Sequence, residues 1–579
     1  MLKRLLRWTI RLAVVVVVLV LIVVVSQYLS HRYRPGSVIV LTLNGLVVER
    51  GTPVRGLIGN NEVPLNAVRE ALKAAGKDPR IDGLAIKVID PQMELAQAQE
   101  IADAITEFKK HGKFTTAYME TAGESGFGNL PYLVASSADE VSMMPQGEMN
   151  LLGVGMREMF ARGTLDWLKI KPNFDAIGKY KSAANIFTQK DFTPAQREED
   201  EALASDMFDQ IVNETANHRH VAPATIKSLV DRAPLAAADG LKSHLVDRLE
   251  YEDQFDDRVK EYRGQHHDLV AYGSYGRPQF VEALSRRNKV AVIYGVGAID
   301  RGESGFDPVL SPGLTSMGSD DMVNAFNQAR DDDSVRAVVF RLDSPGGSVI
   351  ASELIRRAVQ LCAEKKPVVV SMSSYGASGG FWVSTPAASV FADPGTLTGS
   401  IGVLGGKFNI SGAATALGVN SGEVIRGENA DIYDSFTDFT PAQARIFHDQ
   451  ILGDTYQYFL HIVAEQRHMT TDQVNNLAQG RVWTGIQAAQ NGLIDGVGGF
   501  ETALTKAEVL AKLDPRQPVQ LEELPEPPGL LKRILGSGLD GSMGWRAPAA
   551  LVPLLWMVRQ SVSHHGSFGA VYCPLVPVM

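Results

Sequence analysis

The 579-residue sequence is poor in cysteine, which already excludes some kinds of protein. Its only cysteines are Cys362 and Cys573, and no group of cysteines and histidines has the spacing of a zinc site. Lysine and arginine form no basic stripe in the globular part, and the net charge is -10. We therefore expect no zinc site and no nucleic acid as the main partner.

Long uncharged runs are also scarce, and the clearest one lies at the N-terminus. Residues Leu12–Ser30 carry no charge and are rich in valine and leucine, close to the roughly 20 apolar residues that span a bilayer core. Basic residues precede this run, which keeps the N-terminus cytoplasmic under the positive-inside rule. Bulky residues stand where an A-x-A-like cleavage site would lie, so we predict an uncleaved anchor, with a cleaved signal peptide as the alternative. Residues 1–36 are thus predicted to be a cytoplasmic stub and one transmembrane helix.

The chain contains two distant copies of one pattern. Each copy alternates short runs of β-branched residues with amphipathic helical stretches, and each later carries the sequence D-F-T-P-A-Q. Both also contain V-x-x-x-A-x-x-V-x-x-x-P, at Val134, Ala138, Val141 and Pro145 and at Val383, Ala387, Val390 and Pro394. Ordered matches over this length indicate gene duplication followed by divergence.

The alternation also predicts the fold class. Strands that are separated by helical crossovers form βαβ units, so we expect two α/β domains with mostly parallel sheets. The strand AVVFRLD, the helix ASELIRRAVQLCAEK and the strand PVVVSMS form the clearest unit. We predict a first domain at residues 37–285, a second at 286–515 and a C-terminal tail at 516–579.

One serine of the second copy stands in a glycine-rich segment between a predicted strand and a predicted helix. The segment GASGG puts Ser378 at the expected helix start, as an N-cap or as a nucleophile. About six residues separate Ser378 from the apolar strand, so a nucleophile elbow of the α/β-hydrolase kind fits poorly. Upstream, Gly346 and Gly347 follow another strand and could offer backbone N–H groups to an oxyanion, although a tight turn is the alternative. The first copy reads VIDPQMEL there, and its counterpart of Ser378 is close to Asn129, so only the second copy looks equipped for acyl transfer.

A nucleophilic serine needs a base, and histidine is scarce near this serine. None lies between Ser378 and His448, and His448 falls in a helical pattern that does not mark it as catalytic. A lysine is the alternative base, and it acts only as the neutral amine in a poorly solvated pocket. Position in the sequence leaves both possibilities open.

Four motifs in a fixed order resemble one family. They are GKYKSAANIF in the first copy and DSPGGSV, ASGGFWVSTPA and TLTGSIGV in the second. Together they resemble the signal peptide peptidase A family, also called protease IV, in its long form, over nearly the whole chain from the anchor to about residue 510. The resemblance implies tandem ClpP/crotonase-like domains and a Ser/Lys dyad that takes its lysine from the first half and its serine from the second.

The resemblance also implies a role for individual residues. Ser378 would be the nucleophile, Lys181 the general base, and Ser400 would hold the lysine amine. Gly346 and Gly347 would form the oxyanion hole.

A second lysine competes for the role of base, because Lys179 stands just before the motif, but the register of the motif favours Lys181. The expected activity is that of a membrane-anchored serine endopeptidase that digests cleaved signal peptides and similar apolar peptides, with no metal or organic cofactor. The family implies a homotetramer in the inner membrane, with the catalytic domains on the periplasmic side. The alternatives are an inactive membrane scaffold, an acyl-CoA enzyme of the crotonase type, and an α/β-hydrolase-type esterase that uses a distant histidine such as His448.

Overall fold

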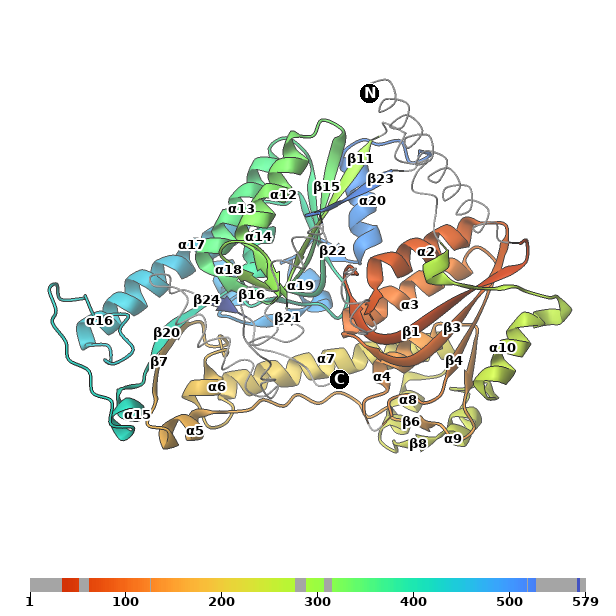
Figure 1. Ribbon diagram of the computed structural model, residues 1–579, viewed down its shortest axis with the longest axis horizontal. Coiled ribbons are helices and arrows are strands. Elements are labelled where there is room, and N and C mark those ends of the chain that lie inside the picture. The colour runs from red at the N-terminus through yellow and green to blue at the C-terminus, as the bar shows by residue number, and fades with distance from the viewer. Residues whose placement is uncertain are drawn as a thin grey trace, which may run out of the picture. The chain divides into compact units, whose positions relative to one another are not determined.

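The computed structural model describes residues 34–51, 62–124, 126–275, 288–306, 315–517, 519–526 and 570–572 (Figure 1). The chain divides into two compact units, each made of several stretches of sequence. Unit 1 comprises Met1–Met93, Ile101–Leu152 and Asn213–Arg286, and unit 2 comprises Glu94–Glu100, Gly153–Val212 and Arg287–Met579. The predicted domains follow the sequence repeats rather than these units, and their boundaries stay a prediction.

Unit 1 is built on a parallel sheet. Its strands have the order β10-β1-β3-β4-β5-β9, and β2 pairs with β1. The bounds are β1 Ser37–Val48, β2 Glu62–Pro64, β3 Ile81–Gln92, β4 Phe114–Met119, β5 Glu140–Met143, β9 Arg248–Leu249 and β10 Leu269–Ala271. The helices around it are α2 Leu65–Lys77, α4 Asn129–Ser136, α8 Pro223–Val230, α9 Ala237–Lys242 and α10 Glu252–Lys260, and the short strands β6 Glu148–Met149 and β8 Leu235–Ala236 pair with each other.

Two long helices contribute residues to both units. The division of the chain falls inside α3, Leu95–Lys109, and inside α7, Pro194–Arg219.

Unit 2 contains a second, mostly parallel sheet. The order is β21-β19-β17-β15-β11-β23, with β18 on β17 and β22 on β18, and only the pair of β19 and β21 is antiparallel. The bounds are β11 Lys289–Val296, β15 Val335–Ser344, β17 Val368–Ala377, β18 Ser389–Ala392, β19 Leu397–Gly399, β21 Val482–Thr484, β22 Gly496–Val497 and β23 Gln520–Leu524. The predicted strands AVVFRLD and PVVVSMS are confirmed as β15 and β17, and both sheets confirm the predicted α/β class.

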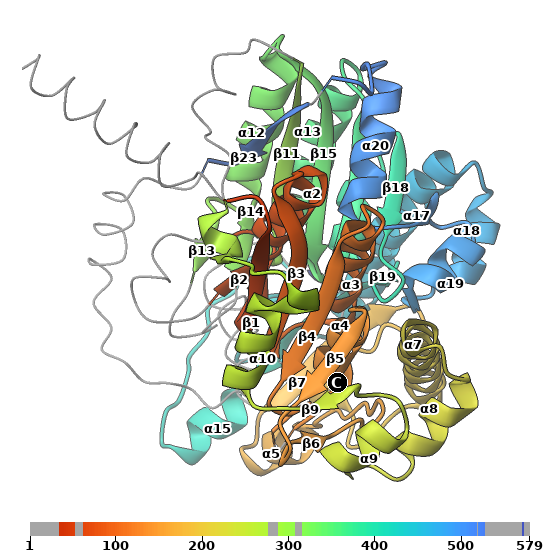
Figure 2. The same ribbon diagram turned by 90° about the vertical axis from the view of Figure 1, so that its right-hand side faces the viewer.

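Helices cover both faces of this second sheet, which explains its continuous apolar strands. Val338, Phe340 and Leu342 of β15 pack with α12 and α13, whereas Val339 packs with α20 (Figure 2). The helices of unit 2 are α5 Arg162–Trp167, α6 Asn185–Thr188, α12 Ser319–Asp331, α13 Val349–Ala363, α14 Gly379–Ser384, α15 Ser411–Ala416, α16 Pro441–Arg445, α17 Asp454–Arg467, α18 Thr471–Leu477, α19 Gly485–Gln490 and α20 Phe500–Leu510.

A third sheet in unit 2 joins segments from the two sequence copies. Its order is β13-β14-β12-β16-β24-β20-β7. The bounds are β7 Lys171–Ile177, β12 Ala298–Asp300, β13 Gly305–Phe306, β14 Thr315–Gly318, β16 Gly346–Ser348, β20 Val403–Asn409 and β24 Ala570–Tyr572. β7 comes from the first copy and pairs antiparallel along its whole length with β20 of the second copy, and Figure 1 shows the two strands side by side.

The repeated sequence D-F-T-P-A-Q begins a helix in each copy. Thr193 accepts the Gln196 N–H at 3.2 Å just before α7, and Thr440 accepts the Gln443 N–H at 3.2 Å just before α16. A threonine N-cap followed by proline at the first helical position is a strong start signal for a helix. The duplication is therefore visible in local structure as well as in sequence.

The predicted membrane anchor at Leu12–Ser30 lies outside the described residues. Within the described part of the chain, no helix combines the length and the apolar character that crossing a bilayer requires.

Candidate active site

Ser378 lies at the junction of β17 and α14. Its N–H donates to the Gly399 carbonyl at 2.7 Å, and its side chain is fully buried and makes no capping hydrogen bond to α14. Its φ is +59°, a value that costs free energy for a residue other than glycine. A strained serine whose hydroxyl is not used as a cap is better explained by chemistry than by helix capping.

One sequence expectation about this serine is wrong. β17 runs through Ala377, so the serine follows its strand directly and not after six residues. The last part of the strand, Tyr375–Ala377, pairs with Leu397–Gly399 of β19. The pattern missed this part because its residues S-S-Y-G-A are not apolar.

Lys181 reaches Ser378 from the segment that follows β7. Its Nζ lies 2.6 Å from Ser378 Oγ, and the lysine is only 4% exposed. The pairing of β7 with β20 carries this first-copy segment to the second-copy serine, and both residues belong to unit 2. A buried ammonium loses hydration, and this loss favours the neutral amine that a general base must be.

Ser400 completes the contacts of the lysine amine. The Lys181 Nζ donates to Ser400 Oγ at 2.9 Å and to the Ser400 carbonyl at 3.0 Å. Ser400 is buried and has a φ of +50° just after β19, and its N–H donates to the Arg481 carbonyl at 2.7 Å. The structure therefore brings the three predicted polar residues into one contact.

The glycine pair lies beside Ser378. Gly346 and Gly347 begin β16, one residue after the end of β15 at Ser344. A Cβ added to Gly379, the residue after Ser378, would lie 3.1 Å from the Gly347 nitrogen. A Cβ on Gly347 itself would lie 2.2 Å from the Ile299 carbonyl, so the loop tolerates no side chain there. The backbone N–H groups of this loop are thus close to the serine that would carry a tetrahedral intermediate.

The two competing bases lie elsewhere. Lys179 is exposed and its Nζ lies over the Tyr180 ring at 4.4 Å from the centroid. His448 is half exposed, and its Nδ1 lies 2.7 Å from Asp175 Oδ2. The hydrogen bond to Ser378 Oγ comes instead from Lys181.

The first copy has no serine at the matching place. Gly128 precedes α4, and its N–H donates to the Asn150 carbonyl at 2.8 Å, as the Ser378 N–H does to Gly399. The structural counterpart of Ser378 is therefore Gly128, and the sequence placed it close to Asn129, the next residue.

Sequence reasoning missed the residues that brace this site. Arg481 donates to the Tyr180 hydroxyl at 3.0 Å and to Glu198 at 3.0 Å, and Glu199 is buried beside them. Burial raises the pKa of Glu199 to about 8. Glu198 and Glu199 belong to the charged run R-E-E-D-E, which is typical of a solvated helix face, so no local signal marked them.

The described residues contain no group of histidine, cysteine, aspartate and glutamate side chains that could hold a metal ion. The chemistry available at the site is that of a buried amine, a hydroxyl and backbone amides. This set is sufficient for acyl transfer through a serine ester.

Comparison with known proteins identifies the family. The profile of Peptidase family S49 matches residues 107–266 and 360–514, one segment in each copy. The chain is 30% identical over 544 residues to Protease 4 of Salmonella typhi, covering 89% of this chain and 84% of that protein. It is 29% identical over 523 residues to the chloroplastic Serine protease SPPA of Arabidopsis thaliana, covering 89% and 75%. It is also 30% identical over 456 residues to Protease 4 of Haemophilus influenzae, covering 76% and 72%. The chain is a serine peptidase and belongs to Peptidase family S49, in the long, duplicated form of signal peptide peptidase A.

Proposed function

We propose that the chain is an endopeptidase with a Ser378–Lys181 dyad that digests cleaved signal peptides and similar apolar peptides. The observation that carries the proposal is the 2.6 Å contact between Lys181 Nζ and Ser378 Oγ in a buried site. A nucleophile and its base within hydrogen-bond reach, with the base held by a third group, is the general pattern of an activated serine. Ser400 is that third group.

The geometry supports the following reaction. The neutral Lys181 amine takes the proton of Ser378 Oγ while this oxygen attacks a peptide carbonyl. Backbone amides near Gly347 stabilise the oxyanion, and the protonated lysine then gives its proton to the leaving amine. Water cleaves the acyl-enzyme with the lysine as base again, and Ser400 holds the amine throughout.

An extended peptide fits the surroundings of the dyad. β24 lies between β16 and β20, paired antiparallel with Gly346–Ser348 on one side and with Leu404 on the other. A segment of chain is thus accommodated in strand conformation beside the glycine loop. A substrate that replaced it would bind by its main chain, which suits short unfolded peptides of varied sequence.

The proposal includes the membrane anchor, with the catalytic units on the periplasmic side of the inner membrane. It rests on the sequence of Leu12–Ser30 and the basic residues before it. Substrates released from the membrane would then be produced near the enzyme. We expect carbonate to leave the full-length protein in the membrane and to extract a variant that lacks residues 1–33. Extraction of the full-length protein would contradict the anchor.

We also propose that the chain forms a homotetramer, and the duplication supports self-association. When the two copies are aligned, β7 of the first copy corresponds to Asn420–Arg426 of the second. In the same alignment, β20 of the second copy corresponds to residues 154–160 of the first. Asn420–Arg426 belongs to no strand and is mostly exposed, and 154–160 alternates exposed with half-buried residues. In Figure 1 the segment between α15 and α16 extends away from the strands of unit 2. A pairing between these two segments of neighbouring copies would repeat the contact of β7 with β20.

Exposed apolar side chains lie at the same places. Trp167 of α5 is 80% exposed, Leu417 after α15 is 82% exposed, and Val424 is 89% exposed. Such exposure on adjoining segments is typical of an interface. Val424→Lys should lower the mass measured by light scattering, whereas Val509→Lys, at an exposed valine on α20, should not; an unchanged mass for Val424→Lys would argue against this interface.

The catalytic proposal is tested with an apolar, signal-peptide-like peptide substrate. Ser378→Ala and Lys181→Ala should abolish cleavage in folded protein, and the matched control Lys179→Ala should not. His448→Ala should also retain activity. If His448→Ala instead abolished cleavage, this result would favour the esterase-type mechanism. Full activity in Lys181→Ala would refute the dyad, and a wild type that neither cleaves the peptide nor reacts with a fluorophosphonate at Ser378 would favour an inactive scaffold.

A further inference from the structure

A short loop, residues 479–482, links the segment that carries Lys181 to Ser400, the residue that holds the lysine amine; we call this loop the brace. The Tyr180 N–H donates to the Gln479 carbonyl at 2.8 Å, next to Lys181, and the Ser400 N–H donates to the Arg481 carbonyl at 2.7 Å. The contact is so close that a Cβ on Gly480 would lie 2.5 Å from the Lys181 nitrogen. The position of the amine relative to Ser400 therefore depends on where the brace lies.

One buried carboxyl holds the end of the brace. Glu199, on α7, is 1% exposed and accepts the Val482 N–H at 2.5 Å through Oε1. Val482 begins β21, and it follows directly the residue whose carbonyl accepts from Ser400. The second oxygen of Glu199, Oε2, is buried and has no hydrogen-bond partner. A buried carboxylate with one unpaired oxygen costs folding free energy, and this cost is smaller when the carboxyl is neutral.

We propose that Glu199 is a positioning residue of the dyad: by accepting the Val482 N–H it fixes the brace, and through the Arg481 carbonyl it fixes Ser400 against the Lys181 amine. The inference rests on the proposed dyad. It adds a residue that touches neither the nucleophile nor the base. A displacement of about 1 Å at the amine would be enough to slow proton transfer on the order of 100-fold.

The charge of Glu199 gives the proposal a second consequence. Burial is the main cause that raises its pKa to about 8, and Asp200 beside it on α7 adds to the rise, while Arg481 on the brace and Lys181 oppose it. At pH 7 the carboxyl is therefore mostly neutral. Above pH 8 it becomes negative, and a negative charge in this site favours the ammonium form of Lys181, which cannot act as a base.

The first experiment compares Glu199→Leu and Glu199→Gln in the full-length protein. Gln keeps an acceptor for the Val482 N–H, and Leu removes it. At pH 7 we expect Glu199→Leu to lower kcat by roughly 10- to 100-fold with little change in KM, and to slow labelling of Ser378 by a fluorophosphonate. Glu199→Gln should stay within about twofold of the wild type, because the neutral carboxyl and the amide accept the same bond.

The chain offers a matched control on the same helix and strand. Asp206 of α7 accepts the Thr484 hydroxyl at 2.6 Å, at the far end of β21 from the brace. Like Glu199→Leu, Asp206→Leu removes a contact between α7 and β21, but it keeps the hydrogen bond from the Val482 N–H to Glu199. The melting temperature of Asp206→Leu should fall as much as that of Glu199→Leu, while its kcat stays near that of the wild type. An equal loss of kcat in both variants would reduce Glu199 to a structural role and overturn the proposal.

The second experiment measures kcat/KM against pH for the wild type and Glu199→Gln. The variant cannot become negative, so between pH 8 and the pKa of Lys181 it should exceed the wild type by up to roughly 3- to 10-fold, the ratio that a shift of about half to one pKa unit produces. Coincident profiles would overturn the charge argument even if Glu199→Leu fails to fold. Failure of the dyad itself is recognised separately, because Lys181→Ala would then retain activity whatever Glu199 does.

Discussion

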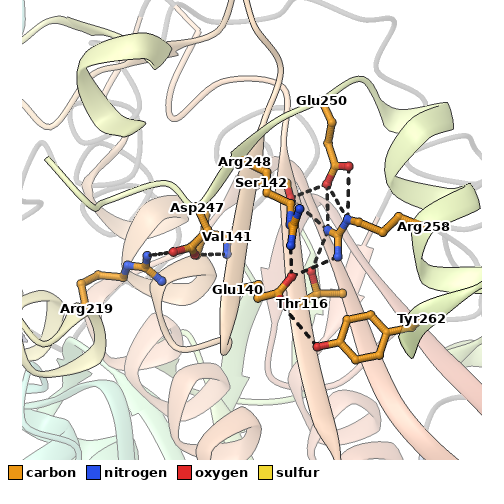
Figure 3. Close-up of polar contacts among 10 residues, drawn as sticks. All are labelled: Thr116, Glu140, Val141, Ser142, Arg219, Asp247, Arg248, Glu250, Arg258 and Tyr262. Atoms are coloured by element: carbon orange, nitrogen blue, oxygen red, sulfur yellow. Dashed lines mark hydrogen bonds and ion pairs between the residues drawn. The ribbon is translucent and has the colours of Figure 1, made fainter. Parts of the chain in front are cut away.

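The two sequence copies hold one strand of their sheets, β5 in the first copy and β18 in the second, by the same contacts, but they differ in the helix before that strand. In the first copy Arg219 binds Asp247 at 2.7 Å, and Asp247 accepts the Val141 N–H of β5 at 2.7 Å (Figure 3). In the second copy Arg467 binds Asp495 at 3.0 Å, and Asp495 accepts the Val390 N–H of β18 at 2.7 Å. The arginine–aspartate clamp on the strand is therefore the same in both copies.

The copies differ at the N-cap of the helix that precedes this strand. The second copy has the strained Ser378 before α14, and the first has Gly128 before α4. Contacts that hold the backbone were retained after duplication, whereas Ser378, the proposed nucleophile, has no serine counterpart in the first copy. The clamp is explained by stability, and the serine by the proposed chemistry.

The largest expected effect separates these two roles. Ser378→Ala should lower kcat by on the order of 10³-fold or more without loss of stability, because Ala removes only a hydroxyl from a strained position. Gly128→Ala should leave the chemistry intact and destabilise unit 1 by about 1–3 kcal/mol, because its Cβ would clash with the Ala122 carbonyl. Peptidase assays and thermal melts of both variants measure the contrast, and an inactive Gly128→Ala that melts like the wild type would break it.

The glycine loop should give the next largest effect. Gly347 has no glycine counterpart in the first copy, and a Cβ there would clash with Ile299. Gly347→Ala should move the loop amides and lower kcat by roughly 10²- to 10³-fold, as does the loss of one oxyanion donor. Met93→Ala, in the matching loop of the first copy, should keep kcat in the same assay; equal losses in both would show that the loop has no special part in catalysis.

A third contrast lies under the last helix of each copy. Beneath α10, Arg258 contacts Glu250 at 2.7 Å and Glu140 at 3.1 Å, with Ser142 alongside (Figure 3). Beneath α20, Phe500, Ala503 and Leu504 form an apolar cluster with the sheet. Because Phe255 and Val259 of α10 also pack against their sheet, the first copy adds ion pairs to the apolar packing that both copies share.

Arg258→Met tests what the ion pairs contribute. It leaves Glu250 without its cation and Glu140 with only the longer contact to Arg248 at 3.5 Å, which should cost about 2–4 kcal/mol in the free energy of unfolding of unit 1. Hydrogen exchange of β5 peptides should accelerate, while peptidase activity in unit 2 persists. The matched control Lys506→Met on α20 should change the hydrogen exchange of β18 little. If β5 exchanges as slowly in Arg258→Met as in the wild type, the ion pairs contribute no net stability.

The sequence predicts the parts of this molecule that repeat or run continuously, and it misses contacts between distant segments. The apolar strands β15 and β17, the helix α13 and the site residues Ser378, Lys181 and Ser400 could be named beforehand, the last three through motif resemblance. The pairing of β7 with β20 could not, because it joins segments more than 200 residues apart and neither is a long apolar run.

Glu199 shows the same limit for a single residue. Its neighbours in the sequence are charged and predict a solvated helix face. Only the close approach of the 479–482 brace to α7 buries this carboxyl, and that approach depends on the whole of unit 2.

The last contrast concerns acid. His218 near the end of α7 lies 3.1 Å from the Ser136 hydroxyl at the end of α4, and at the matching place in the second copy Gln466 donates to the Ser384 carbonyl at 3.2 Å. Burial lowers the pKa of His218 to about 4, below the value near 6.5 of an unfolded chain. Between these values the unfolded chain binds more protons, so the stability contribution is complete above pH 6.5 and is lost as the pH falls toward 4, by at most about 3 kcal/mol. Gln466 does not titrate, so His218→Gln should make the first copy resemble the second. Hydrogen exchange of α4 at pH 4.5 and pH 7 should then differ less in the variant than in the wild type, and an equal difference in both would show that His218 does not cause the sensitivity of this copy to acid.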